Sequence, residues 1–96
     1  MSIVGTRGGA PEVFRADVST DGIYHFLKAS SKWLCIKAKT NNCRVFFTEV
    51  DFTQDINYIE IVVDTYWEGP LEINKIWFKG VEGASSIELV VARRLN

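Results

Sequence analysis

Runs of branched aliphatic and aromatic residues alternate with turn signals along the whole chain. In residues 86–93, Ile87, Leu89 and Val91 occupy every second position, as on one face of an extended strand. Residues 57–64 show the same alternation. No stretch of eleven or more residues has the apolar spacing of an amphipathic helix. This pattern predicts an all-β domain.

Strands and turns are expected to follow one another at short spacing, which is typical of an antiparallel sandwich. The seven expected strands are Val13–Val18, Ile23–Lys28, Trp33–Lys39, Cys43–Glu49, Asn57–Asp64, Leu71–Lys79 and Ser86–Arg93. The apolar positions of the sixth strand change phase at Asn74-Lys75, which indicates a β-bulge or a bend between sheets. We therefore expect a single antiparallel β-sandwich of about seven strands, of jelly-roll or immunoglobulin-like type.

The third and fourth expected strands are read as a hairpin. The dipeptide Asn41-Asn42 between them accepts the positive φ angles of a type I′ turn. In that register Ala38 lies opposite Val45 and Ile36 lies opposite Phe47, so that apolar residues face each other. The opposite face of the hairpin then carries the set Lys37, Lys39, Arg44 and Phe46.

The same register separates the two cysteines, Cys35 and Cys43. At about 3.3 Å per residue their positions differ by roughly 16 Å along the hairpin. A disulfide needs Cα atoms within about 7 Å, so two free thiols are expected. Two thiols are also too few for a structural zinc site.

The 96 residues fit one domain, with 47% hydrophobic residues and a net charge of −1. Residues 1–11 contain three glycines and a proline but no apolar segment of the signal-peptide kind, so we expect a flexible arm ahead of a sandwich spanning residues 12–96. No stretch approaches the length of a transmembrane helix, and we expect no membrane partner.

The sequence contains no motif that is typical of a catalytic or metal-binding site. His25 is the only histidine and has no flanking motif of a catalytic triad. Glu49, Asp51 and Asp55 cluster in one expected loop but lack the spacing and the central glycine of a calcium-binding loop. We therefore expect no enzyme activity, no metal and no cofactor.

Charges are sorted along the chain. Among the charged residues, those in positions 28–44 are all basic and those in positions 49–72 are all acidic. Cross-strand pairs within one molecule would neutralise the two groups. Alternatively, a basic patch of one copy meets an acidic patch of the next and closes a head-to-tail ring. The sequence leaves both interpretations open.

Several aromatic residues fall outside the expected core positions. Trp77 lies between two lysines, Tyr58 shares a strand face with Glu60, and Tyr66-Trp67 lies in an expected loop. Tyrosine and tryptophan are enriched at protein interfaces and also stack on sugars. The candidate interface residues are Tyr58, Tyr66, Trp67, Trp77, Lys37, Lys39, Arg44, Glu60 and Asp64.

The end of the chain resembles a known class of proteins. Residues 69–80, which end in Trp77-Phe78-Lys79-Gly80, and residues 85–93, which form an Ile/Val-rich strand ending in Arg93, are similar to the closing segment of small β-sandwich virion proteins of tailed bacteriophages. The resemblance covers about a quarter of the chain and is a pattern, so no individual residue role is transferred. It implies a capsid cement or decoration protein.

Three function classes remain open at this level. The first is a non-enzymatic structural protein that self-associates, with a trimer and a contact to the major capsid protein implied by the resemblance. Its place would be the virion, assembled in the host cytoplasm, or the cytoplasm if the protein is not viral. The alternatives are a carbohydrate-binding sandwich and a single-stranded nucleic-acid-binding β-barrel, the last disfavoured by the slightly acidic net charge.

Overall fold

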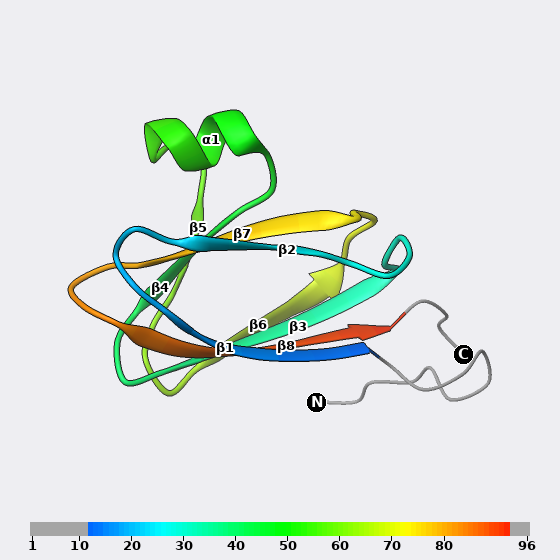
Figure 1. The fold of residues 1–96 in the computed structure, drawn as a ribbon. Helices are drawn as coiled ribbons and strands as arrows, with labels where there is room; N and C mark the ends of the chain where they lie inside the picture. Colours follow the sequence, from blue (N-terminus) through cyan, green and yellow to red (C-terminus); the bar gives the residue numbers. More distant parts are fainter. Residues whose placement is uncertain (1–11, 93–96) are drawn as a thin grey trace.

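The computed structural model describes residues 12–92 as two four-stranded antiparallel sheets packed face to face (Figure 1). Sheet A holds β1 (Glu12–Val18), β8 (Ser85–Ala92), β3 (Trp33–Lys39) and β6 (Tyr66–Pro70) in that order. Sheet B holds β2 (Ile23–Phe26), β7 (Lys75–Gly80), β4 (Cys43–Phe46) and β5 (Ile59–Ile61). One short helix, α1 (Glu49–Gln54), joins β4 to β5. The expected β-sandwich is confirmed. The expected N-terminal arm, residues 1–11, lies outside the described residues.

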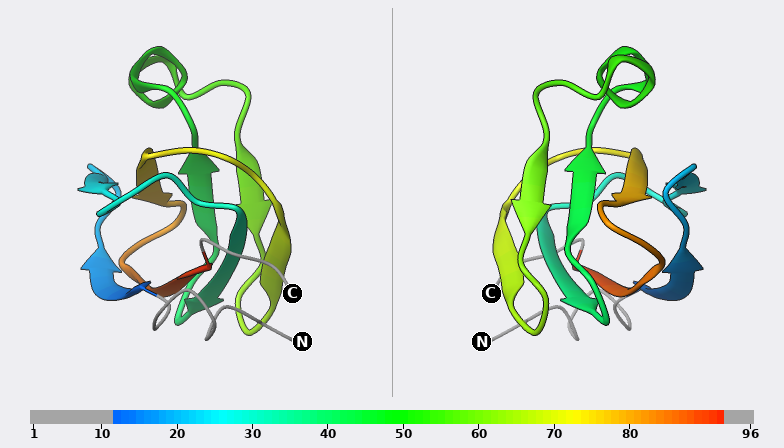
Figure 2. Two further views of the ribbon diagram at one scale, coloured as in Figure 1. Left: turned by 90° about the vertical axis from the view of Figure 1, so that its right-hand side faces the viewer. Right: turned by 90° about the vertical axis from the view of Figure 1, so that its left-hand side faces the viewer.

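The strand pairs are nested. β1 pairs with β8, β2 with β7, β3 with β6, and β4 with β5, all antiparallel. The chain passes from one sheet to the other at every connection except the one between β4 and β5. The topology is therefore that of one long antiparallel hairpin wrapped around a barrel-like core, with the β4–β5 connection as its tip (Figure 2).

The core lies between the two sheets and follows the period-2 pattern of the sequence. Ile87, Leu89 and Val91 of β8 point inward as expected, at 3%, 0% and 0% exposure. From sheet B, Ile76 and Phe78 meet them and are fully buried. Each such side chain contributes about 1.5–3 kcal/mol through removal of its apolar surface from water. Burial of these inward faces is what holds the two sheets together.

The expected hairpin of the third and fourth strands is wrong. β3 pairs with β8 and β6 in sheet A, whereas β4 pairs with β7 and β5 in sheet B. The positive φ angle falls on Thr40, at 77°, and the connection after it turns a corner between the sheets. Cys35 and Cys43 are buried free thiols, as expected, although the geometry that led to this expectation does not exist.

An eighth strand and a helix replace two expected features. Tyr66–Pro70, read as a loop and turn, forms edge strand β6, where a proline is tolerated. α1 begins within the segment expected to end the fourth strand: the Thr48 hydroxyl accepts a hydrogen bond from the Asp51 backbone N–H at 3.1 Å and caps the helix. Asp55 then ends the helix in the left-handed conformation, with a φ of 56°.

The phase change at Asn74-Lys75 marks a passage between sheets, as expected. β6 ends in sheet A at Pro70, and β7 begins in sheet B at Lys75. The connecting residues are held by backbone hydrogen bonds from Leu27 to Asn74 and from Ser31 to Ile73, both 2.9 Å. No helix within residues 12–92 is long and apolar enough to cross a membrane.

Candidate functional site

The outer face of sheet B carries a row of aromatic side chains that crosses the sheet. Tyr24 of β2 lies opposite Trp77 of β7, which lies opposite Phe46 of β4. Tyr58, just before β5, continues the row, with its ring centroid 5.6 Å from that of Phe46. We call these four residues the aromatic row. A second apolar layer is thus built outside the main core.

α1 covers one half of the aromatic row. Phe52 of α1 packs edge-on against Phe46, with ring centroids 5.5 Å apart, and Phe46 is fully buried although it faces the outer side of its sheet. Trp77 lies on the outer face of its strand, as expected, but it is covered and only 6% exposed, so it offers no exposed aromatic surface. Tyr58 remains 37% exposed. The helix therefore acts as a cover that turns part of this sheet face into a small core.

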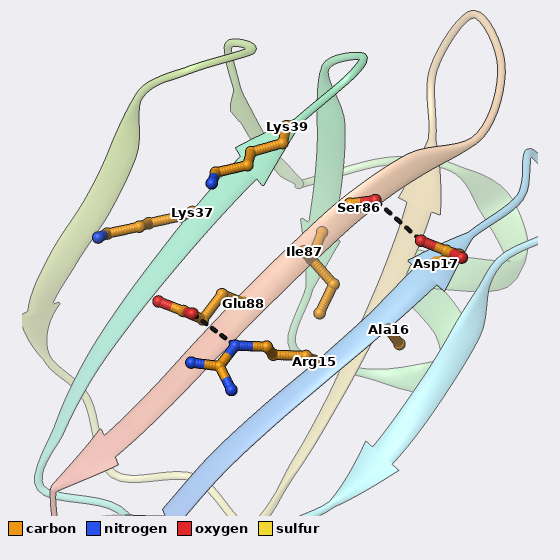
Figure 3. A pocket seen from close by; sticks show the side chains of 8 residues that line it. All are labelled: Arg15, Ala16, Asp17, Lys37, Lys39, Ser86, Ile87 and Glu88. Atoms are coloured by element: carbon orange, nitrogen blue, oxygen red, sulfur yellow. Dashed lines mark hydrogen bonds and ion pairs between the residues drawn. The ribbon is translucent and has the colours of Figure 1, made fainter.

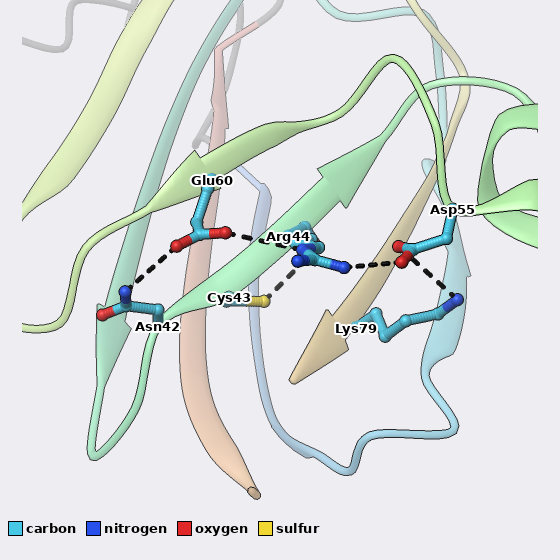
Figure 4. Close-up of polar contacts among 6 residues, drawn as sticks. All are labelled: Asn42, Cys43, Arg44, Asp55, Glu60 and Lys79. Atoms are coloured by element: carbon cyan, nitrogen blue, oxygen red, sulfur yellow. Dashed lines mark hydrogen bonds and ion pairs between the residues drawn. The ribbon is translucent and has the colours of Figure 1, made fainter. Parts of the chain in front are cut away.

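An ionic network anchors α1 to sheet B (Figure 4). Arg44 of β4 donates to the Asp55 carboxylate at 2.5 Å and to Glu60 at 3.4 Å, and its guanidinium lies 4.4 Å from the Tyr58 ring centroid. Burial disfavours the charge on Arg44, but its hydrogen bonds to the two carboxylates outweigh this and raise its pKa. Lys79 of β7 donates to the Phe52 carbonyl at 3.1 Å.

The other half of the aromatic row is open to solvent. Tyr24 and Phe26, which alternate along edge strand β2, are 58% and 60% exposed, and their rings meet edge-on at 5.5 Å. The Lys75 ammonium lies 4.2 Å from the Phe26 ring centroid, 4.8 Å from that of Tyr24 and 4.9 Å from that of Trp77. Within residues 12–92 no carboxylate lies at ion-pair distance from Lys75. We call Tyr24, Phe26 and Lys75 the β2 patch.

The outer face of sheet A has a hollow of about 500 Å³ over β1, β8 and β3 (Figure 3). Arg15 lines it and pairs with Glu88 at 2.7 Å. Lys37 and Lys39 of β3 also line it, without a carboxylate at ion-pair distance in the described part of the chain. The hydrogen bond from Arg15 lowers the pKa of Glu88, and the positive charges of Arg15, Lys37 and Lys39 act in the same direction. Three basic and two acidic side chains line the hollow, which therefore carries a net positive charge.

The structure distributes the remaining candidate residues over separate surfaces. Tyr66 is 50% exposed at the edge of sheet A, and with Asp64 it borders a smaller hollow that Lys37 and Lys39 also line. Trp67 is opposite Ile36 and half-buried against the core, so it offers no exposed platform. The four aromatic candidates do not form one surface.

The expected basic face with an aromatic residue does not form. Lys37 and Lys39 lie on sheet A, whereas Arg44 and Phe46 lie on sheet B, and Phe46 is covered. The β2 patch, in contrast, was not anticipated. Its signal was the alternation Tyr24-His25-Phe26, in which the two rings share one face of the strand and the imidazole points to the other.

The buried polar groups serve structural roles. His25 Nε2 lies 2.8 Å from Glu12 Oε2, its ring stacks on Phe14 at 3.9 Å, and the Glu12 Oε1 accepts the Lys28 backbone N–H at 3.0 Å. Burial raises the pKa of both thiols, that of Cys43 to about 11, which keeps it protonated and a poor nucleophile. Among residues 12–92 no cluster of His, Cys, Asp or Glu is suited to hold a metal ion.

The nested strand pairs in two four-stranded sheets define a jelly-roll β-sandwich. Of the two sandwich types expected from the sequence, jelly-roll and immunoglobulin-like, the structure has the first. Its distinguishing surfaces are the β2 patch, the anchored α1 and the hollow on sheet A. No family model, no curated protein and no solved structure matches the chain.

Proposed function

We propose that this chain is a non-enzymatic structural protein that self-associates, and that it serves as a virion accessory protein of the capsid cement or decoration type. The observation that carries the self-association is the β2 patch. Two aromatic side chains that are 58% and 60% exposed adjoin each other on an edge strand, beside an ammonium group without a carboxylate partner in the described part of the chain. Exposed apolar surface of this kind is typical of a protein interface.

The composition of the patch suits a protein partner better than a sugar. Sugar rings stack on flat aromatic faces, but the Tyr24 and Phe26 rings stand at 85° to each other and so present no common plane. Exposed aromatic residues are, in contrast, among the residue types enriched where proteins meet. The nucleic-acid alternative has less support still, because its basic residues are divided between the two sheets.

The virion role rests on two further observations. Residues 69–80 and 85–93, which carry the resemblance to phage virion proteins, include the whole of β7 and of β8, which are interior strands of sheet B and sheet A. The jelly-roll sandwich is an architecture that recurs in viral capsid proteins, among others. A trimer that contacts the major capsid protein is the assembly we propose for this role.

Light scattering coupled to size-exclusion chromatography over a dilution series tests the self-association. The wild-type chain is expected to form a discrete oligomer. Replacing Tyr24 and Phe26 together by serine is expected to raise its dissociation constant between about thirtyfold, the loss of one aromatic hot spot of about 2 kcal/mol, and about a thousandfold, the additive loss of two. Val62→Ser, at a residue 52% exposed in the turn after β5, is the matched control. A monomer at every concentration would refute the proposal.

The virion role needs a separate measurement. Mass spectrometry of virus particles purified by density centrifugation from the producing cells is expected to detect this chain in a fixed ratio to the major capsid protein. Particles that lack the chain while the cells contain it would contradict this role and leave the self-association untouched.

A further inference from the structure

α1 is the segment that lies farthest from sheet A. It lies on the outer side of sheet B, within the connection between β4 and β5 (Figures 1 and 2). Its first turn exposes Glu49, and Val50 is 60% exposed. Asp51 follows, and its Oδ1 lies 3.4 Å from the Asn57 amide. In the described part of the chain no basic side chain pairs with either acidic residue. The tip, defined as residues 49–51, is thus an acidic and apolar projection.

The tip is held rigidly despite its exposure. Thr48 caps the helix, Phe52 is packed on Phe46, and Lys79 binds the Phe52 carbonyl at 3.1 Å. Asp55 at the end of the helix is fixed by Arg44. A segment already fixed in one conformation loses little entropy when it docks, so preorganisation of this kind favours binding.

The hollow on sheet A complements the tip in charge. Lys37 and Lys39 have no carboxylate partner in residues 12–92, and with Arg15 they give the lining of the hollow three basic side chains against two acidic ones, Asp17 and Glu88. The remaining acidic residue of the hollow, Asp17, accepts a hydrogen bond from the Ser86 hydroxyl at 2.8 Å. The hollow is therefore suited to a carboxylate-bearing projection.

We propose that the α1 tip of one copy docks in the sheet A hollow of a second copy, with the carboxylates of Glu49 and Asp51 facing Lys37 and Lys39. The tip and the hollow lie on opposite sides of the sandwich, so a copy cannot fill its own hollow, and the contact is head to tail (Figures 1 and 3). Such a contact closes into a ring if the rotation between copies allows it. This inference rests on the proposed self-association and adds a second contact between copies to that of the β2 patch.

Complementary charge reversals test this pairing directly. Lys39→Glu reverses the hollow, and Glu49→Lys reverses the tip; neither side chain has a hydrogen bond or an ion pair in the structure. Each variant alone is expected to raise the dissociation constant of the oligomer at least about tenfold, since like charges then meet. The double variant Lys39→Glu/Glu49→Lys, which carries both reversals in one chain, is expected to regain wild-type affinity within about threefold. In this variant every tip finds a hollow of opposite charge, whatever the number of copies in the ring.

Two control variants carry the same changes of net charge elsewhere. Lys28→Glu and Glu82→Lys lie in exposed loops and are expected to leave the dissociation constant unchanged. Circular dichroism of each variant confirms that the sandwich is intact. The wild-type affinity is expected to fall with added salt, because the contact is ionic.

The outcomes separate this inference from the proposed function. If the wild type is an oligomer that neither reversal weakens, the tip-to-hollow contact is overturned while self-association stands. If both reversals weaken the oligomer but the double variant does not recover, or if only Lys39→Glu has an effect, the hollow has another occupant and the inference is also overturned. A wild-type chain that stays monomeric removes the proposed self-association and this contact together.

Discussion

Two phenylalanines on the outer face of sheet B give a sharp test of how α1 covers the sheet. Phe46 is fully buried beneath the helix, whereas Phe26, on the same outer face, is 60% exposed. Phe46 contacts the rings of Phe52 and Tyr58 edge-on, at 5.5 and 5.6 Å. Phe46→Ala and Phe26→Ala delete the same atoms from the same sheet face, so any difference between them reports the cover.

The magnitude follows from burial. Replacing a buried phenylalanine by alanine typically costs about 3–5 kcal/mol, from lost transfer free energy and from the cavity left behind. Because α1 is short and partly able to settle into the cavity, we expect about 3 kcal/mol for Phe46→Ala. An exposed residue changes the unfolding free energy by about 0.5 kcal/mol or less, which is our expectation for Phe26→Ala.

Urea unfolding followed by tryptophan fluorescence measures both variants, at a dilution where the chain is monomeric. In thermal unfolding, a loss of about 3 kcal/mol in the free energy of unfolding corresponds to a fall in Tm of roughly 12–24 °C for a domain of this size. Hydrogen exchange adds a local readout, because the Asp55 N–H that bonds to the Phe52 carbonyl should exchange faster only in Phe46→Ala. Equal effects of the two substitutions would show that α1 does not cover the sheet.

Three further predictions concern buried groups. Burial raises the pKa of Cys43 from 9.0 to about 11, so the folded state binds this proton more tightly than the unfolded state. The contribution of Cys43 to stability is therefore constant below about pH 9 and falls by about 3 kcal/mol or less as the pH rises through 11. Cys43→Ala should lose less stability over that interval in urea titrations, and an identical loss would contradict the assignment. Gly22→Ala should lower the free energy of unfolding by about 1–3 kcal/mol in thermal unfolding, because the φ of Gly22 is 88° and the new Cβ would lie 2.5 Å from the Phe52 ring. Gly83→Ala, whose new Cβ has its nearest contact at 3.2 Å, should lower it less. Glu12→Ala should cost about 2–3 kcal/mol, because the carboxylate links β1 to β2, and a loss no larger than that of an exposed glutamate would refute this role.

The alternation of apolar residues predicts which face of a strand is buried, but it does not predict which sheet the strand joins. Ile87, Leu89 and Val91 point inward as expected. In a sandwich, however, the inward faces of both sheets pack against the same core. The apolar pattern of β3 and β4 is therefore the same whether the two strands lie in different sheets or pair in one hairpin. The nesting of strand pairs depends on contacts between distant segments, which local sequence does not report.

Short elements escape the pattern for a different reason. α1 has six residues, too few for an apolar stripe, and only the capping sequence that begins at Thr48 announces it. β6 ends in Gly69-Pro70, a turn signal in most contexts, but an edge strand tolerates proline because one side of its backbone needs no partner. Phe46 was placed on an outer face correctly, yet it is buried because α1 covers it.

The sorted charges of the sequence are resolved only in part within one molecule. Arg44 pairs with Asp55 at the end of α1 and across strands with Glu60, and Lys32 pairs with Glu72 at 3.1 Å, so neutralisation within the molecule accounts for these residues. The ion pairs that form hold α1 and the β6–β7 connection in position. Lys37 and Lys39 on one side of the sandwich, and Glu49 and Asp51 on the other, form no ion pair within residues 12–92. Cross-strand pairing within a sheet cannot join them, because the sandwich itself stands between the two groups. The unpaired charges therefore lie where a neighbouring copy can neutralise them, and residues 12–92 of the same chain do not.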